Sequence, residues 1–300
     1  MTFKKAVTAL ITFLAVVTLT ACGKKGADSQ DNWKKFESKK SVTIGFDNTF
    51  VPMGFKDKNG KNVGFDIDLA NAVFNEYGIK VKWQPINWDL KETELKNGKI
   101  DLIWNGYSKT RERARKVSFT KPYMKNDQVL VTKKSSGITS FADMKGKALG
   151  AQSGSSGYDA FTANPKILKD IVKDNDASQY ETFTQAFIDL KNDRINGLLI
   201  DRVYANYYLK QEKELDNYNI IKGKYASEDF SVGVRKSDKT LKKKVNQAFK
   251  KLYKNGKFQA ISQKWFGQDV ASKRSRGKHN HSFLKIVKKR MISDKAYWLI

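Results

Sequence analysis

The residues with the clearest capacity for chemistry lie in one stretch, 100–113, which reads IDLIWNGYSKTRER. Arg113 would stand in the first turn of a helix capped by Thr110, where the partial positive charge of the helix end prefers anions. A cation there is unfavourable by roughly 0.3–1 kcal/mol unless an anion joins it. With the backbone N–H groups of Gly106 and Ser108 free, Arg113 could clamp a carboxylate. A solvated basic helix face is the alternative.

An apolar strand precedes this clamp. Ile100–Trp104 is short enough for a buried parallel strand, and Asn105-Gly106 then breaks it. A strand, a loop and a helix in this order present a ligand at the carboxyl end of a sheet.

The second half of the chain repeats the pattern. Ala148–Gln152 reads as a strand, and the Gly/Ser loop 153–157 then opens a helix in a form suited to anions. The loop is neither a Walker A loop nor a dinucleotide fingerprint. The segment 190–198 (LKNDRINGL) also echoes 95–103 (LKNGKIDLI), each being a helix end before a buried strand. We therefore expect two similar α/β lobes around a shared cleft, with Arg113 from one and Asp201 from the other. Opposite charges facing across a cleft suit a zwitterion.

Further elements follow from period and turn signals. Strands are expected over 41–46, 80–86, 128–132, 180–183 and 195–200, and helices over 89–96, 239–254 and 258–265. Thr184 is expected to cap a helix that runs to about Asp193. Asp66 and Asp68 fall in the first turn of a helix opened by Gly64, where the helix dipole and cap explain them better than acid/base catalysis.

Composition indicates a globular protein with a strong positive charge. The 300 residues include 57 Lys and Arg against 31 Asp and Glu, a net charge of +26. The basic residues are mostly Lys and occur without zinc-finger spacing or an RNP-like aromatic motif, which disfavours nucleic acid as a partner. The remaining explanations of the positive charge are attraction to an anionic cell envelope and a surface that only keeps the protein soluble.

The N-terminus is typical of an export signal. Lys4 and Lys5 precede an apolar run over 6–19, and Leu19-Thr20-Ala21-Cys22 resembles the lipobox of bacterial lipoproteins. That resemblance implies a signal peptide over 1–21, lipidation of Cys22, attachment to the membrane and a polar linker over 22–37. An ordinary signal peptide with a stray cysteine is the alternative.

Several motifs, in order, resemble the extracytoplasmic solute-binding proteins of bacterial ABC importers for polar amino acids. They are GFDIDL (64–69), TRER (110–113), FTKPY (119–123), QSGS (152–155) and KWFG (264–267). Phe74 is bulkier than the family's usual residue. The resemblance covers about 38–267 and implies an α/β, two-lobe, periplasmic-binding-protein-like (type II) fold. Lobe 1 would be 38–126 plus 229–267, lobe 2 would be 127–228, and hinge strands would cross near 129–132 and 225–230.

The same resemblance assigns roles in the cleft. Arg113 would take a ligand's α-carboxylate, helped by Ser108 and the backbone around Ser156, while Asp201 and the Gly106 carbonyl would take its α-ammonium. The remaining predicted site residues are two aromatic walls, Phe50 and Trp88, and two groups that face the ligand's side chain, Asp47 and Gln152. Core packing of the aromatic residues and helix capping by Asp201 are the alternatives, and the case for Gln152 is the weakest.

These features predict a lipid-anchored, monomeric receptor that delivers a glutamine-like or cystine-like amino acid to an ABC permease, without a cofactor or metal. A cationic amino acid also remains open. A dehydratase-like enzyme, with Asp47 as its acid, and a surface adhesin are the competing functions. The basic segment 268–300 departs from the family and is expected to lie outside the fold. It holds His279 and His281, too few ligands for a structural zinc.

Overall fold

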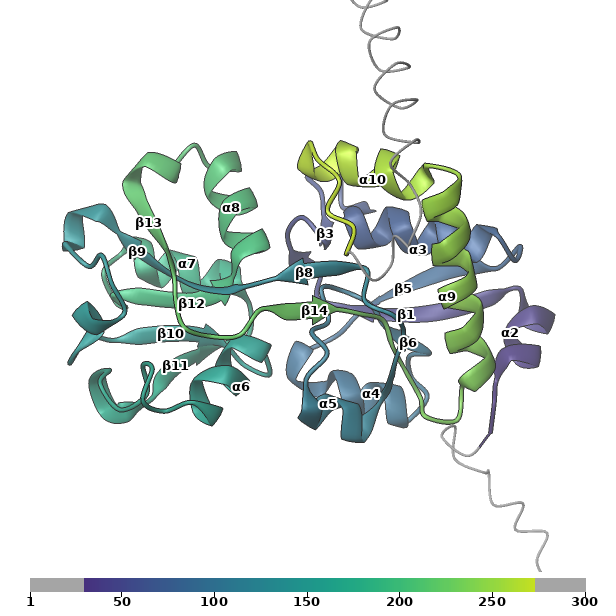
Figure 1. Cartoon of the computed structure of the whole chain (residues 1–300), viewed down its shortest axis with the longest axis horizontal. Helices are drawn as coiled ribbons and strands as arrows, with labels where there is room; N and C mark the ends of the chain where they lie inside the picture. Colours follow the sequence, from purple (N-terminus) through teal and green to yellow (C-terminus); the bar gives the residue numbers. More distant parts are fainter. Residues whose placement is uncertain (1–29, 273–300) are drawn as a thin grey trace, which may run out of the picture.

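The computed structural model describes residues 30–272 and shows two α/β lobes side by side, joined by two crossing strands (Figure 1). Lobe 1 comprises 30–126 and 229–272, and lobe 2 comprises 127–228. The crossing strands β8 (Met124–Asn126) and β14 (Glu228–Phe230) pair antiparallel. The predicted two-lobe fold is confirmed. The stretch 129–132, expected to cross between lobes, lies instead inside the sheet of lobe 2.

Lobe 1 contains a five-stranded sheet in the order β5-β1-β6-β15-β7. β1 pairs parallel with β5 and β6, and β15 runs antiparallel to β6 and β7. Its strands are β1 (Ser41–Phe46), β5 (Lys80–Pro85), β6 (Leu102–Ile103), β7 (Ser118–Phe119) and β15 (Gly233–Val234), beside a small sheet of β2 (Thr49–Phe50), β3 (Gly54–Lys56) and β4 (Asn62–Val63). Its helices are α2 (Trp33–Lys39), α3 (Phe65–Asn75), α4 (Lys91–Lys96), α5 (Arg111–Lys116), α9 (Lys239–Lys254) and α10 (Lys257–Phe266), with a 3₁₀ turn at Trp88–Leu90.

Lobe 2 contains a second five-stranded sheet, in the order β11-β10-β12-β9-β13. β10 pairs parallel with β11 and β12, whereas β9 runs antiparallel to its neighbours β12 and β13. The strands are β9 (Gln128–Lys133), β10 (Leu149–Gln152), β11 (Ala177–Tyr180), β12 (Gly197–Asp201) and β13 (Tyr218–Lys222). The helices are α6 (Ser156–Ala163), α7 (Phe183–Lys191) and α8 (Arg202–Gln211), with 3₁₀ turns at Lys134–Ser136, Ala142–Met144, Lys173–Asn175 and Leu215–Asn217.

The strand predicted over 180–183 was placed three residues too late, because β11 ends at Tyr180. A capping box starts the next helix: the Thr182 hydroxyl accepts a hydrogen bond from the Gln185 N–H, and the Gln185 side chain accepts one from the Thr182 N–H. Thr182 is therefore the cap, and not Thr184. Phe183 and Phe187 are buried one helical turn apart, so their spacing follows the helix rather than a strand.

At both ends of the described chain, the fold includes residues that were expected to lie outside it. α2 buries Trp33 and Phe36, so the last part of the predicted linker 22–37 packs on lobe 1. Beyond α10, Ala271 forms a bridge with Met124, and Ser272 is buried against lobe 1. The signal segment, Cys22 and both histidines lie outside the described residues. Among residues 30–272, no helix is long and apolar enough to cross a membrane.

The acids at the start of α3 do not cap it, contrary to the prediction, since this helix start has no side-chain cap. Asp66 is fully buried, and its Oδ2 accepts hydrogen bonds from the Gly106 N–H (2.7 Å) and the Tyr123 hydroxyl (2.9 Å). Asp68 accepts hydrogen bonds from Lys264 and from the Trp265 indole. Asp66 thus supports the loop after β6, and burial raises the pKa of Asp66 to about 7.

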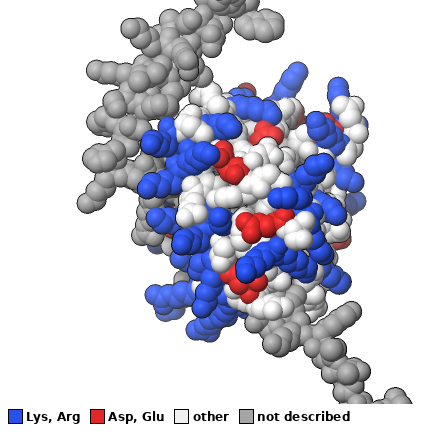
Figure 2. Space-filling view, turned by 90° about the vertical axis from the view of Figure 1, so that its right-hand side faces the viewer, with Lys and Arg blue, Asp and Glu red and all other residues white. Residues whose placement is uncertain are grey.

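Charge is distributed unequally over the surface. Figure 2 shows the end of lobe 1 that is remote from lobe 2, where Lys and Arg side chains far outnumber acidic ones. Lobe 1 holds 30 Lys and Arg against 15 Asp and Glu, whereas lobe 2 holds 14 of each.

Asp66→Asn should flatten the dependence of stability on pH. The folded pKa of Asp66, about 7, lies above its ordinary 3.8, so the folded state binds more protons between these values. The stabilisation from Asp66 is complete below pH 3.8 and is lost as pH rises through 7, by up to about 4 kcal/mol. Urea unfolding at several pH values measures it, with Asp57→Asn, at a partly exposed acid, as control. An unchanged slope in Asp66→Asn would refute the assignment.

Candidate functional site

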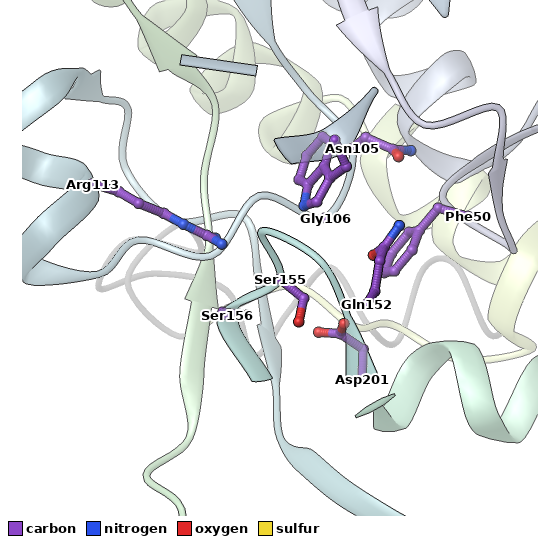
Figure 3. A pocket seen from close by; sticks show the side chains of 9 residues that line it. Phe50, Asn105, Gly106, Arg113, Gln152, Ser155, Ser156 and Asp201 are labelled. Atoms are coloured by element: carbon purple, nitrogen blue, oxygen red, sulfur yellow. The ribbon is translucent and has the colours of Figure 1, made fainter. Parts of the chain in front are cut away.

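A cavity of about 230 Å³, its mouth included, lies between the lobes (Figure 3). It is placed at the carboxyl ends of β6, β10 and β12, as expected for ligand sites in parallel α/β sheets. Lobe 1 contributes Phe50, Trp88, Asn105, Gly106 and Arg113, and lobe 2 contributes Gln152, Ser155, Ser156 and Asp201.

Arg113 is buried and is shared by the two lobes. The predicted cap is confirmed, because the Thr110 hydroxyl accepts a hydrogen bond from the Arg113 N–H. The guanidinium donates to the Ser108 carbonyl of lobe 1 (3.2 Å) and to the Gly154 carbonyl of lobe 2 (2.9 Å). It also lies 3.3 Å from a carboxylate oxygen of Asp159, again in lobe 2. The expectation that Gly106 offers a free N–H is wrong, since Asp66 accepts that hydrogen bond.

Lys91 is a second buried cation at the same boundary, and no local sequence pattern marked it. Its Nζ donates to the carbonyls of Trp88 (3.0 Å) and Gly154 (2.9 Å) and lies 3.4 Å from Glu92. Burial, together with repulsion from Arg113, lowers the pKa of Lys91 to about 8. The carbonyl of Gly154 therefore accepts hydrogen bonds from two cations of the other lobe.

Asp201 supplies an acidic side chain on the opposite side of the cavity. It precedes α8, but its side chain does not cap the helix. Instead Oδ1 accepts hydrogen bonds from the side-chain amides of Asn126 (2.5 Å) and Gln128 (3.0 Å). Burial and, after it, the charge of Glu228 raise the pKa of Asp201 to about 8.

Glu228, on the crossing strand β14, collects hydrogen bonds from both lobes. Its Oε2 accepts from the hydroxyls of Ser108 in lobe 1 (2.5 Å) and Ser156 in lobe 2 (2.9 Å), and from Gln128 (3.2 Å). A serine hydroxyl has one proton, so the Ser108 oxygen is left as an acceptor on its other side. Glu228 was not predicted, because a lone acid near a strand carries no distinguishing signal.

A third contact between the lobes closes the end predicted to face a ligand's side chain. The Gln152 amide of lobe 2 donates to Asp47 of lobe 1 (2.8 Å) and to the Glu181 carbonyl (3.0 Å). Asp47 also accepts hydrogen bonds from the N–H and the hydroxyl of Thr49. Burial raises the pKa of Asp47 despite these donors.

The aromatic walls come from lobe 1. Phe50 reaches lobe 2, where its ring centroid lies 5.9 Å from Phe183 and 5.6 Å from Tyr204. Trp88 packs edge-on against Tyr107 at 5.8 Å. Both side chains line the cavity and also pack in the core. They therefore act both as cavity walls and as core residues.

The structure brings seven of the nine predicted residues to the cavity lining. Asp47 and Ser108 are behind the lining, each one hydrogen bond from a lining residue, Gln152 and Ser156 respectively. Two lining residues were missed. Asn105 was taken as a strand breaker, and Ser155 belonged to a recognised motif but also caps α6. Among residues 30–272, no cluster of His, Cys, Asp and Glu could hold a metal.

Comparison with known proteins identifies the family. Residues 42–268 match the bacterial extracellular solute-binding proteins, family 3. The chain belongs to this family. The predicted family is therefore confirmed, and with it an extracytoplasmic location.

Two curated relatives in this family come from Escherichia coli (strain K12). ABC transporter arginine-binding protein 1 is 33% identical, over 76% of this chain and 91% of its own length. The L-cystine-binding protein TcyJ is 29% identical, over 87% and 96%.

Two solved structures of family relatives are more similar in sequence. An ABC uptake transporter substrate-binding protein from Streptococcus pneumoniae with bound histidine is 67% identical, over 81% of this chain and 99% of its own, with a TM-score of 0.81. A polar amino acid counterpart from Streptococcus thermophilus is 62% identical, over 85% and 98%, with a TM-score of 0.55.

Gly154→Ala should hinder the approach of the lobes. Gly154 has φ +65°, and a Cβ atom there would lie 2.8 Å from Cα and Oδ1 of Asp89 across the boundary. Gly146→Ala is the matched control, because it has φ +67° in the same lobe with open space around it. We expect the amino-acid ligand, identified by calorimetry with a panel of polar amino acids, to bind at least about tenfold more weakly to Gly154→Ala. Equal affinity in the two variants would contradict this.

Proposed function

We propose that this solute-binding protein captures a free polar amino acid, with L-histidine as the first candidate, and delivers it to an ABC importer permease. One observation carries the proposal: a buried cation, Arg113, and a buried acid, Asp201, line one small cavity between two hinged lobes. Every free amino acid, whatever its side chain, carries the complementary pair of charges, an α-carboxylate and an α-ammonium. Charge-assisted hydrogen bonds in a dry cleft give a small ligand its affinity.

The α-carboxylate of the ligand is assigned to Arg113, whose planar guanidinium suits a carboxylate. The α-ammonium is assigned to Asp201 and the Gly106 carbonyl. In this structure the Ser108 hydroxyl donates to Glu228, and the single proton of Ser156 is shared between Glu228 and Ser108, so neither hydroxyl has a proton left for a ligand carboxylate. We therefore assign these two hydroxyls to the ammonium end of the ligand, whereas the family resemblance implied that Ser108 and the backbone around Ser156 would help to bind its carboxylate.

The side chain of the ligand is assigned to the end formed by Asp47 and Gln152. A buried carboxylate accepts N–H groups and repels acids, which favours an imidazole or a guanidinium over a carboxylate side chain. The flanking rings of Phe50 and Trp88 suit a flat or long group. Histidine, bound by the 67% identical pneumococcal relative, meets both conditions, and arginine, cystine and glutamine are the next candidates.

Ligand capture is assigned to closure of the lobes about β8 and β14. The two streptococcal relatives have similar identities, 67% and 62%, but TM-scores of 0.81 and 0.55. Sequence divergence does not account for this gap, which supports two arrangements of the lobes. The structure described here resembles the histidine-bound one. A ligand that binds across both lobes favours the closed arrangement in proportion to its differential affinity.

Transport, rather than catalysis, is the assigned activity, because the curated relatives above are named for binding and transport. We further assign lipid attachment to Cys22, on the lipobox-like sequence, and expect a monomer held at the outer face of the cytoplasmic membrane.

Arg113→Gln should abolish binding of L-histidine while leaving the melting temperature of the ligand-free protein within a few degrees. Loss of a buried, charge-assisted pair typically weakens binding by about 2–5 kcal/mol, or about 30-fold and more. Arg111→Gln, an exposed neighbour on the same helix, is the control and should bind normally. Calorimetry with a panel of L-amino acids measures both. Tight binding by Arg113→Gln would show that Arg113 does not bind the ligand carboxylate. If no amino acid in the panel binds the parent protein, the proposal is overturned.

Binding should release a proton near neutral pH. Burial raises the pKa of Asp201 to about 8, so below this pH the acid must lose its proton to pair with an ammonium. The affinity therefore rises with pH up to about 8. Calorimetry in buffers of different ionisation enthalpy measures the release, and Asp201→Asn should lose this component. The imidazole of histidine contributes to proton release with both proteins. The difference in proton release between the parent protein and Asp201→Asn therefore reports Asp201. Equal proton release would contradict the assignment.

A further inference from the structure

The excess positive charge of the described chain is confined to one lobe. Lobe 1 has 30 basic and 15 acidic residues, and lobe 2 has 14 of each. Both lobes are built on related sheets and both are exposed to solvent, so a charge that served only solubility would need no such segregation. The segregation indicates a partner for lobe 1.

Within lobe 1, exposed lysines gather on the end remote from the cleft (Figures 1 and 2). α9 turns its apolar residues inward, and its outer side carries a row of lysines. The lysines of this surface, which we call the basic end face, are Lys34, Lys35, Lys39 and Lys40 at α2, Lys80 and Lys82 on the edge strand β5, and Lys239, Lys243, Lys250 and Lys254 on α9.

Contacts between these elements make the basic end face continuous. The Lys244 ammonium of α9 lies 5.3 Å from the ring centroid of Trp33 in α2. The Tyr77 hydroxyl, beyond α3, donates to the Lys244 carbonyl. The Lys80 N–H of β5 donates to the Lys40 carbonyl. The lysines on these elements therefore share one surface.

The lysines of the basic end face form no close ion pairs within the described residues, although Lys239 acts at longer range on Asp31. Within residues 30–272, none of its ten lysines has a carboxylate oxygen within 4 Å, whereas neighbouring lysines such as Lys251 and Lys264 form ion pairs. Lys239 with Lys243 and Lys250 with Lys254 are like-charge pairs four residues apart, which destabilise a helix. The basic end face is thus a local cost to the fold and is available to an external anion.

We propose that the basic end face docks on the anionic phospholipid headgroups of the membrane. The chain enters the fold at this face, where Asn32 bonds to Asp238 and Asp31 bonds to Thr240 at the start of α9. On the lipid anchor assigned above, eight residues separate Cys22 from Asp31, a reach of about 30 Å at most. The reach of this tether rests on the proposed function, which includes the lipid anchor.

Headgroups suit this surface. A leaflet presents many phosphates over a flat area, so it can pair with lysines spread over three elements without a pocket. Each lysine held near an anionic leaflet strengthens the association about fivefold. The attraction acts over about 8 Å at physiological salt, well inside the reach of the tether. Docking through this end leaves the cleft, on the other side of lobe 1, open to ligand.

The test compares two fourfold Lys→Gln variants of the full-length chain, both carrying Cys22→Ser so that no lipid is attached. One removes Lys35, Lys243, Lys250 and Lys254 from the basic end face, and the other removes the exposed Lys134, Lys145, Lys166 and Lys210 from lobe 2. Both lose the same charge and keep both termini. The readout is the ratio of partition constants on phosphatidylglycerol-containing and pure phosphatidylcholine vesicles, which cancels apolar contributions.

We expect this ratio to fall at least about tenfold in the end-face variant and at most about twofold in the lobe 2 variant, and to fall for the parent as salt is raised. Equal losses in the two variants, or no loss in either, would overturn the proposal. So would binding to soluble poly(glycerol phosphate) without binding to vesicles, which would make a polymer the partner. A melting temperature that does not fall and unchanged amino-acid binding in both variants separate this result from misfolding and from failure of the receptor function.

Discussion

A buried guanidinium makes the two lobes depend on each other. Removing a cation from water is costly unless it gains partners, and Arg113 of lobe 1 finds them in the Gly154 carbonyl and Asp159 of lobe 2. Lys91 uses the same carbonyl. Closure therefore both desolvates these cations and supplies their partners. On the proposed assignment, a ligand carboxylate at Arg113 would join this arrangement, so recognition and closure would act through one charge.

The hinge carries the complementary negative charge. Glu228 binds a serine from each lobe, and Gln128 links it to Asp201. Burial, and after it the nearby charge of Glu228, raises the pKa of Asp201. An ammonium group relieves the repulsion between these two acids. The position of Glu228 on the crossing strand makes the relief sensitive to how the lobes are arranged.

Local patterns in the sequence predicted local structure well. β1 and α9 have the predicted bounds, because alternation and helical periodicity are strong in both. The predicted clamp helix starts at its Thr110 cap. What failed depends on contacts between distant segments. Asp66 stands in the first turn of α3 as predicted, but its buried hydrogen bonds were missed because its partners, Gly106 and Tyr123, lie 40 and 57 residues away. Lys91 and Glu228 gain significance only when the lobes meet, and no local pattern marks such residues.

The central claim is that an amino acid closes the lobes about β8 and β14 by joining the buried charges between them. The most direct measurement is the radius of gyration from small-angle X-ray scattering, without ligand and with saturating L-histidine. The account predicts a smaller radius with ligand for the parent protein and no change for Arg113→Gln. Tight binding of histidine with an unchanged radius in the parent protein would contradict it.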